Sequence, residues 1–310
     1  MLYVTTRDKS DAYTTPHAFR ADRAPDGGFY LPFRMPCFSQ QELEDWKGKS
    51  FAQTVADILN LFFSCRLTSW DVEFSAGRYP VKLTSLQQRI CIGELWHNQS
   101  GDYIGLEKTL ALKIDPSLTK PVSWVKIAVR IAVLFGIYTE MCRNETLSDG
   151  DSFDIALHEA DLVAVTAAWY SRKMGLPIEN IVIGCSENSS VWDLLHVGEV
   201  RLDQTTPGEA ERLVHGALGI DEVTRFIDAC EKCAEYSLQP EMHERLRSGV
   251  FASVVSESRV DDTIPNVYRT ATYTLDRGAA QAYSALQDYR AKCGTSRVAL
   301  VLSEQRPEDI

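Results

Sequence analysis

The pattern of apolar and polar positions changes about a third of the way along the chain. Up to residue 115 it is irregular and rich in aromatic residues. Apolar residues at helical spacing predict a helix from Ser50 to Phe63, and alternating runs at residues 79–83 and 89–96 predict two strands. The later residues follow a different pattern. We therefore expect one domain over residues 1–115 and a second over residues 116–310.

The second part has the pattern of an α/β protein. The mostly apolar residues from Phe153 to Leu157 predict a short buried strand, and the helical pattern after it ends at Gly175 and Pro177. Another apolar run, at 181–185, predicts the next strand. A strand, a helix and a strand in this order imply parallel strands with a right-handed crossover. Further helices are expected at residues 191–197, 207–217, 221–236, 241–248 and 278–292, and a last buried strand at 298–302.

One segment is apolar on nearly every side. It runs from Trp124 to Phe135, and Pro121 and Ser123 before it suit the start of a helix. A helix without a polar face is buried between layers of a protein or covered by another subunit. Because uncovered apolar surface tends to become an interface, we expect a homodimer or a hetero-complex formed through this region.

The composition is that of a folded globular protein, with 45% hydrophobic and 24% charged residues. The net charge of -11 argues against binding to nucleic acid, because affinity for phosphate backbones comes largely from lysine and arginine. No stretch is apolar over the roughly 18 residues that a membrane span requires, and the first residues lack the pattern of a signal peptide. We expect a cytoplasmic protein that binds neither nucleic acid nor membranes.

Eight cysteines are spread along the chain in apolar surroundings, which favours reduced thiols over a disulfide framework. Cys230 and Cys233 alone have a spacing found in metal and redox sites, but no second such pair completes a zinc site. On the helix expected there, a separation of three puts both thiols on one face, so we interpret the pair as buried helix packing. The six histidines show no metal-ligand spacing, and we predict no metal site.

Three segments resemble the threonine synthase family, in the family's order. The first residues and the later turn Ala-Pro-Asp-Gly-Gly are similar to its N-terminal signature. Ser123 and Trp124 begin a helix that resembles the family's Asn-Ser-Ile-Asn-Trp helix, and a third segment resembles its Tyr-Tyr-Ala-Lys-Lys-Met-Gly-Leu-Pro-Ile run. The segments are residues 3–7 with 24–32, 123–135 and 169–178. Several matches in order indicate common ancestry better than one short motif does.

The resemblance implies an α/β fold, with a threonine synthase N-terminal domain plus a reduced fold type II, tryptophan synthase β-like, parallel-sheet core. It also implies a pyridoxal phosphate cofactor, held as a Schiff base by the lysine of Gly-Pro-Thr-x-Ala-Phe-Lys-Asp. Here Leu95-Trp96-His97 is followed by an unrelated sequence, and ungapped alignment puts Ile104 at the lysine position. An isoleucine can neither form an imine nor move a proton.

Two further departures affect the expected cofactor site. The family's glycine-rich phosphate turn is matched by residues 160–163, so that Glu159 and Asp161 stand where a dianion would bind. We interpret Asp161 as a first-turn acid or cap of the helix instead. The small domain that closes over the substrate in the family has no counterpart, since Pro116 is followed almost at once by the helix at Ser123.

A few positions match the family or lie near its cleft. Ser303, after the last predicted strand, matches the hydroxyl residue that faces the pyridine nitrogen. Residues 187 and 188 follow a predicted parallel strand, at the edge where α/β sheets place ligands, although Asn188 or Ser189 could also cap the next helix. The vestigial cofactor-site candidates are Glu187, Asn188 and Ser303. The candidates for contact with a remaining small ligand are His97, His158 and Glu159.

The sequence therefore predicts a threonine synthase-like pseudoenzyme, related to threonine biosynthesis by ancestry, that does not bind pyridoxal phosphate. Its expected role is protein interaction or small-molecule binding. Lys108 and Lys113 lie one or more helical turns beyond the lysine position, which is too far for an unchanged active site. The alternative is an enzyme: a threonine synthase-like carbon–oxygen lyase rebuilt around a different lysine, or a cofactor-independent hydrolase.

Overall fold

The computed structural model describes residues 1–76, 81–95, 104–118, 123–148, 150–202 and 208–303. At its centre is a six-stranded sheet with the strand order β10-β7-β6-β11-β5-β4. Neighbouring strands are parallel except for β4 and β5, which form an antiparallel pair at one edge. The strands are β4 (Val81–Leu86), β5 (Ile90–Leu95), β6 (Phe153–His158), β7 (Ile178–Cys185), β10 (Val250–Val254) and β11 (Ala299–Ser303).

The predicted strand–helix–strand unit is confirmed. β6, α7 (Leu162–Lys173) and β7 follow one another, and β6 and β7 are parallel neighbours. The strand expected at 298–302 is β11, between β5 and β6 in the sheet. The two strands expected near residues 80 and 90 correspond to β4 and β5, although residues 79, 80 and 96 lie outside the described residues. The sequence pattern did not predict β10.

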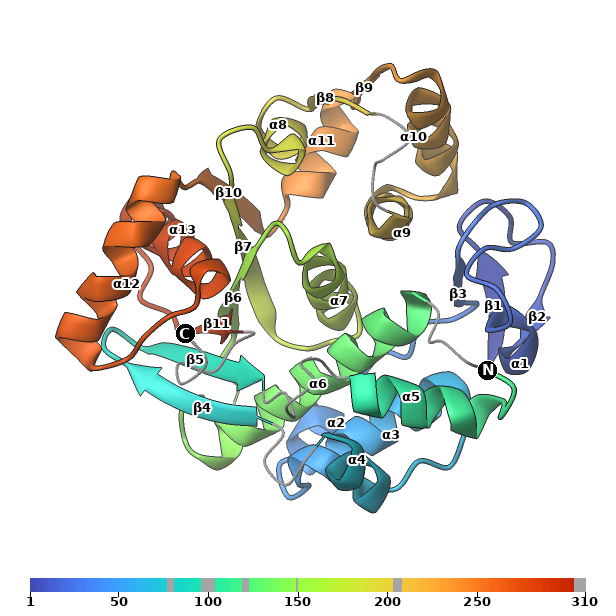
Figure 1. Ribbon diagram of the computed structural model, residues 1–310, viewed down its shortest axis with the longest axis horizontal. Helices are drawn as coiled ribbons and strands as arrows, with labels where there is room; N and C mark the ends of the chain where they lie inside the picture. Colours follow the sequence, from blue (N-terminus) through green and yellow to red (C-terminus); the bar gives the residue numbers. More distant parts are fainter. Residues whose placement is uncertain (77–80, 96–103, 119–122, 149, 203–207, 304–310) are drawn as a thin grey trace.

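Helices cover both faces of the sheet (Figure 1). Alternate residues of a strand point to opposite faces, so Ile155 and Ile183 join one apolar cluster while Ala156 and Val182 join another. The first cluster includes α3, α6 and α7, and the second includes α12 and α13. These helices, apart from α7, are α3 (Phe51–Phe63), α6 (Ser123–Arg143), α12 (Glu257–Ala271) and α13 (Arg277–Cys293).

The long helix α6 packs against α3 and α7. Trp124 is fully buried, with its ring edge-on to Phe62 of α3 and Tyr170 of α7. From Trp124 to Phe135 every apolar residue is at most 1% exposed. The helix is therefore buried between layers of its own chain, one of the two arrangements expected for a helix without a polar face. A homodimer or hetero-complex formed through this region stays a prediction.

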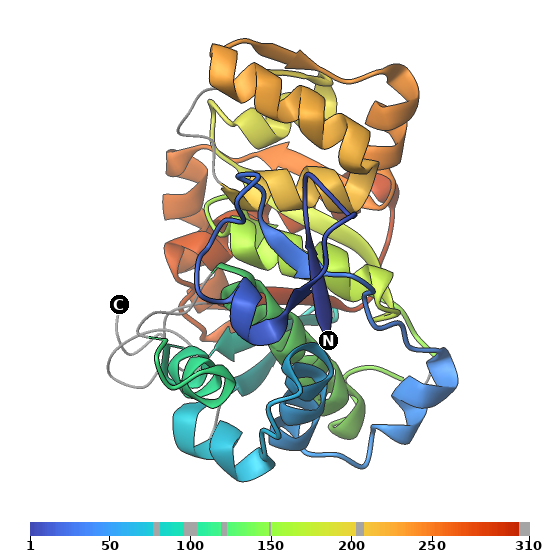
Figure 2. The same ribbon diagram turned by 90° about the vertical axis from the view of Figure 1, so that its right-hand side faces the viewer.

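The N-terminal residues form a small antiparallel sheet with the order β2-β1-β3. Gly27, in the predicted turn, has a φ of 79°, and the guanidinium of Arg7 lies against it. Arg7 also pairs with Glu211 of α9 at 3.2 Å, which holds this sheet beside the later part of the chain (Figure 2). The elements are β1 (Leu2–Thr5), β2 (Tyr13–Thr14), α1 (Thr15–Ala18), β3 (Tyr30–Pro32), α2 (Gln40–Asp45), α4 (Ser69–Ala76), α5 (Ile104–Ile114) and α9 (Gly208–Leu218).

A smaller group of elements lies between β7 and β10 in the sequence. The helix expected at 221–236 ends at Lys232, because Cys233 has a left-handed φ of 51° and residues 235–237 pair with β8. Cys233 is thus exposed beyond the helix, and its predicted packing on a buried helix face is wrong; Cys230 is half-buried. The elements besides α9 are α8 (Ser190–His196), β8 (Glu199–Arg201), α10 (Ile220–Lys232), β9 (Glu235–Ser237) and α11 (Pro240–Arg247).

The strand pairing bears on the boundary expected near residue 115. β5, from the first part of the chain, pairs along its length with β11, from the second, so both parts contribute to one sheet. The division into domains 1–115 and 116–310 stays a prediction. Across the described ranges, no helix combines the length and the apolar character needed to cross a membrane.

Candidate functional site

The N-terminus of α7 is where the resemblance places the cofactor phosphate. Asp161 is the N-cap, and its Oδ1 accepts a hydrogen bond of 2.9 Å from the backbone N–H of Ala164. Its Oδ2 lies 3.4 Å from Nη2 of Arg130 in α6, and both side chains are only 14% exposed. The predicted cap is therefore confirmed, and a carboxylate of this chain occupies the position that favours an anion.

Glu159 lies just before this cap and connects two loops. Its carboxylate accepts a hydrogen bond of 2.6 Å from the backbone N–H of Ser186, and it also accepts the hydroxyls of Ser186 and Ser189. Ser189, rather than Asn188, caps α8, because its Oγ accepts from the backbone N–H of Trp192 at 3.0 Å. Glu159 thus fixes the start of α8 relative to the end of β6.

Ser303 ends β11 and is 1% exposed. Its hydroxyl donates to Oδ2 of Asp276 at 2.5 Å, and Oδ1 of Asp276 caps α13 through the backbone N–H of Ala279. Across the sheet Ser303 pairs with Glu94 of β5, which is 2% exposed. Burial, with Glu94 close by, raises the pKa of the Tyr273 phenol above its usual range. The sequence analysis predicted neither Glu94 nor Asp276 here.

His158 ends β6 at the same edge of the sheet and is half-buried. A Cβ added to Gly278 would lie 2.8 Å from its ring, so the start of α13 packs closely on His158. Glu187 is exposed in the turn after β7, and Asn188 beside it lines a cavity. His97 lies outside the described residues.

Ile104 is the first residue of α5. The two nearby lysines differ in their surroundings: Lys108 is exposed, whereas Nζ of Lys113 lies 2.9 Å from Oδ2 of Asp71 in α4. Lys113 is therefore engaged in holding α5 against α4. Between β5 and α6 the described residues form this helix alone, with residues 96–103 and 119–122 outside the described part.

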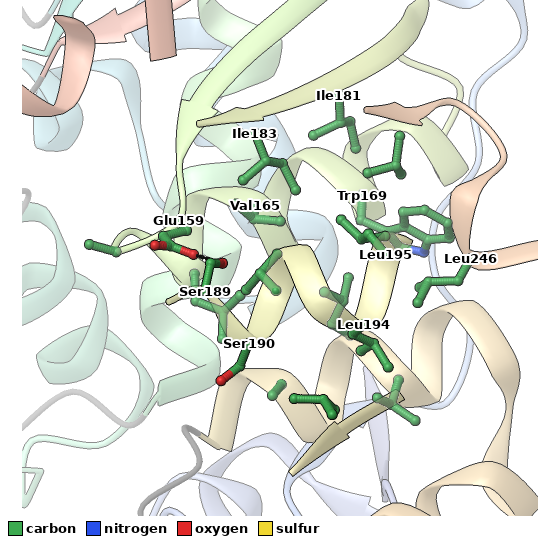
Figure 3. A pocket seen from close by; sticks show the side chains of 18 of the residues that line it. Glu159, Val165, Trp169, Ile181, Ile183, Ser189, Ser190, Leu194, Leu195 and Leu246 are labelled. Carbon is green, nitrogen blue, oxygen red and sulfur yellow. Dashed lines mark hydrogen bonds between the residues drawn. The ribbon is translucent and has the colours of Figure 1, made fainter. Parts of the chain in front are cut away.

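A cavity of about 390 Å³ opens beside Glu159 and extends along α7 (Figure 3). Most of its lining is apolar and comes from α7, β7, α8, α9 and α11. The sequence analysis did not predict it, since lining residues such as Trp169 and Leu246 have the pattern of ordinary core positions. A cavity between elements can be identified only when their packing is known.

The residues at the start of α7 do not fit the phosphate of pyridoxal phosphate. A phosphate site there needs backbone N–H groups that the anion can approach, and Asp161 already accepts one of them. No glycine stands between Glu159 and Leu162 to open the turn. Both acidic residues would repel a dianion.

The comparisons with known proteins agree with the sequence resemblance. The family model described as "Threonine synthase N terminus" matches residues 2–74. Threonine synthase-like 1 of Homo sapiens is 22% identical over 181 residues, covering 54% of this chain and 24% of that protein. Threonine synthase-like 2 of Mus musculus is 30% identical over 106 residues, covering 31% of this chain and 22% of that protein. The chain thus spans less than a quarter of the length of these relatives.

Solved structures agree over the whole chain. The PLP-bound threonine synthase from Brucella melitensis has a TM-score of 0.83 at 16% identity, covering 100% of this chain and 89% of that one. Threonine synthase from yeast has a TM-score of 0.81 at 16% identity, covering 99% of this chain and 87% of that one. The architecture is therefore that of fold type II pyridoxal phosphate enzymes, as predicted. Within this class, the N-terminal residues 2–74 match the threonine synthase N-terminal family, and the fold resembles that of solved threonine synthases.

Proposed function

We propose that this protein is a non-catalytic member of the threonine synthase family, which does not hold pyridoxal phosphate and acts instead by binding a small molecule or another protein. The observation that carries the proposal is the carboxylate of Asp161 at the N-terminus of α7. A phosphate bound there would have to displace Asp161 from Ala164 and approach Glu159 as well. Each carboxylate would oppose the dianion by about 1 kcal/mol even when screened by water.

The lysine position supports the same proposal. Ile104 in the aligned position cannot form the imine through which the cofactor would stabilise a carbanion. Lys113 is paired with Asp71, and Lys108 is exposed on the surface of α5. A catalytic amine has to be held close to the reacting carbon, which supports a structural role for Lys113 and a surface position for Lys108.

The location and association of the protein are part of this proposal. All eight cysteines lie within the described residues and none forms a disulfide, which supports a cytoplasmic location. A homodimer or hetero-complex formed through the region of α6 from Trp124 to Phe135 is part of the same proposal. The link to threonine biosynthesis is one of ancestry, since the proposal includes no conversion of a substrate.

The experiment that tests the proposal is incubation of the purified protein with pyridoxal phosphate, followed by its absorption spectrum. We expect no band of a protein-bound aldimine near neutral pH. The variant Ile104→Lys should also give none, because Asp161 and Glu159 remain. A threonine synthase with its native lysine serves as the positive control.

A band lost on borohydride treatment, with the label found on Lys108 or Lys113, would contradict the proposal. That result would support the alternative, a lyase rebuilt around a different lysine. Peptide mapping of the reduced protein distinguishes these two lysines from surface lysines that react without specificity.

A further inference from the structure

The cavity beside α7 has the size of a ligand site. Its volume of about 390 Å³ falls in the range of small-molecule pockets, whereas well-packed protein interiors leave few voids larger than a water molecule. It lies among the helices α7, α8, α9, α10 and α11 on one face of the sheet, next to β7 and β10. A space of this kind favours a molecule from outside the chain.

The body of the cavity is apolar. Val165 and Trp169 of α7, Ile183 of β7 and Leu194 of α8 are among its walls, and Leu246 of α11 lies beside Trp169 at one end (Figure 3). Apart from the indole N–H of Trp169, these side chains offer no hydrogen-bonding group, so this part of the cavity favours a hydrocarbon or an aromatic ring. Trp169 is 5% exposed and forms an aromatic wall there.

The opposite end of the cavity is polar and negatively charged. Glu159 and Ser189 lie at this end (Figure 3), and Glu159 is the one charged residue in the described lining. Its hydrogen-bond donors are neutral: the Ser186 backbone N–H and two serine hydroxyls. Within the described residues, no lysine, arginine or histidine forms an ion pair with it. A partly buried carboxylate with neutral partners attracts a cation.

The distance between the two ends sets the shape of the ligand. Trp169 comes eight positions after the N-cap Asp161 along α7, which corresponds to about 12 Å at the rise of an α-helix. A molecule that spans the cavity therefore has a cationic group at one end and an elongated apolar body. The net charge of -11 would also attract such a cation from solution.

We propose that this cavity binds a hydrophobic primary amine, with its ammonium group on Glu159 and its apolar body along α7 towards Trp169. The inference rests on the small-molecule-binding part of the proposed function and names the chemical class of the ligand. Glu159 takes a binding role here, and no bond of the ligand is made or broken.

The test is calorimetric titration of the full chain with octylamine, without pyridoxal phosphate. Octan-1-ol and octanoate have the same body with a neutral and a negative head, and propylamine has the head without the body. We expect octylamine to bind, octan-1-ol to bind about tenfold or more weakly, and octanoate and propylamine not to bind measurably. Equal binding of octylamine and octan-1-ol would overturn the role of Glu159.

Two variants and a matched control locate the site. Glu159→Gln should weaken octylamine binding about tenfold or more while leaving octan-1-ol binding unchanged. Glu187→Gln makes the same change on the exposed turn outside the cavity and should have no effect. Leu194→Trp places a larger side chain in the apolar part of the cavity and keeps Glu159. It should abolish the binding of octylamine and of octan-1-ol. Circular dichroism checks that each variant folds.

The outcomes separate this inference from the proposed function. Failure of every octyl compound to bind, in a protein that forms no aldimine, would overturn the cavity proposal and leave the non-catalytic proposal intact. If Glu159→Gln weakens octylamine binding and the protein does form an aldimine, the non-catalytic proposal is overturned and the cavity proposal stands. Octylamine binding that Leu194→Trp does not change would place the amine elsewhere and also overturn the inference.

Discussion

Ser303, at the end of β11, donates its hydroxyl to Asp276, the N-cap of α13, at 2.5 Å. The hydroxyl that the family resemblance assigns to a pyridine nitrogen is here part of the junction between a central strand and the helix that covers it. Asp276 is 6% exposed and accepts from both Ser303 and Ala279. The contact therefore stabilises the fold at the edge of the sheet where β11 ends.

Replacing Asp276 should test this structural role. Asp276→Ala removes the cap of α13 and the acceptor of a buried hydroxyl, and we expect the free energy of unfolding to fall by about 2 kcal/mol. Asp276→Asn keeps an acceptor in place and should cost less. Urea unfolding measures both. An alanine variant as stable as the wild type would show that the two hydrogen bonds do not stabilise the native state.

Asp161 offers a similar test at the start of α7. Asp161→Ala removes the cap on Ala164 and the ion pair with Arg130, and should lower the free energy of unfolding by about 2 kcal/mol. Asp161→Asn retains an oxygen for the cap and isolates the contribution of the charge. If the asparagine variant is as unstable as the alanine variant, the ion pair rather than the cap is the main contribution.

Gly184 marks a close contact between the sheet and α13. A Cβ added there would lie 2.7 Å from the backbone oxygen of Gln281, which cannot rotate away. Gly184→Ala should therefore separate β7 from α13 and cost about 1–3 kcal/mol in stability. Gly48→Ala is the matched control, since a Cβ at Gly48 meets no atom within 4 Å, and it should change stability by less than about 0.5 kcal/mol. Thermal unfolding of the two variants gives the comparison.

The sequence predicted those elements whose pattern is local. The strands β6, β7 and β11 are mostly apolar, and the N-cap of α3 is Ser50, which forms a capping box with Gln53. α12 was not predicted, because its interior contains Pro265 and its sequence is mostly polar. β10 was not predicted either. It is short and becomes a strand by pairing with β7, about 70 residues earlier in the sequence.

In the candidate site, too, local contacts could be predicted from the sequence and long-range contacts could not. The cap at Asp161 depends on residues three positions apart, so the sequence could predict it. The contact of Ser303 with Asp276 and its pairing with Glu94 depend on how a strand, a loop and a helix start are placed in space. The cavity beside α7 likewise depends on the packing of five helices, and most of its lining residues are of the same types as core residues.

Asp71 gives a prediction about acid stability. Hydrogen bonds from Thr68, with the pairing to Lys113, lower the pKa of Asp71 from 3.8 to about 2. Because the folded-state pKa is below the unfolded value, the carboxylate stabilises the protein fully above pH 4, and this stabilisation is lost as the pH falls from 4 to about 2.

We therefore expect Asp71→Asn to be less stable than the wild type by about 1 kcal/mol at pH 6, and the difference to shrink towards zero as the pH approaches 2. Other carboxylates titrate in both proteins, so the difference between their free energies of unfolding isolates Asp71. Lys113→Met removes the ion pair and keeps Thr68, the larger cause of the shift, so it should reproduce only a small part of the effect. Urea unfolding at several pH values measures the difference in the free energy of unfolding between the wild type and Asp71→Asn. A difference that stays constant from pH 6 to pH 3 would contradict the lowered pKa of Asp71.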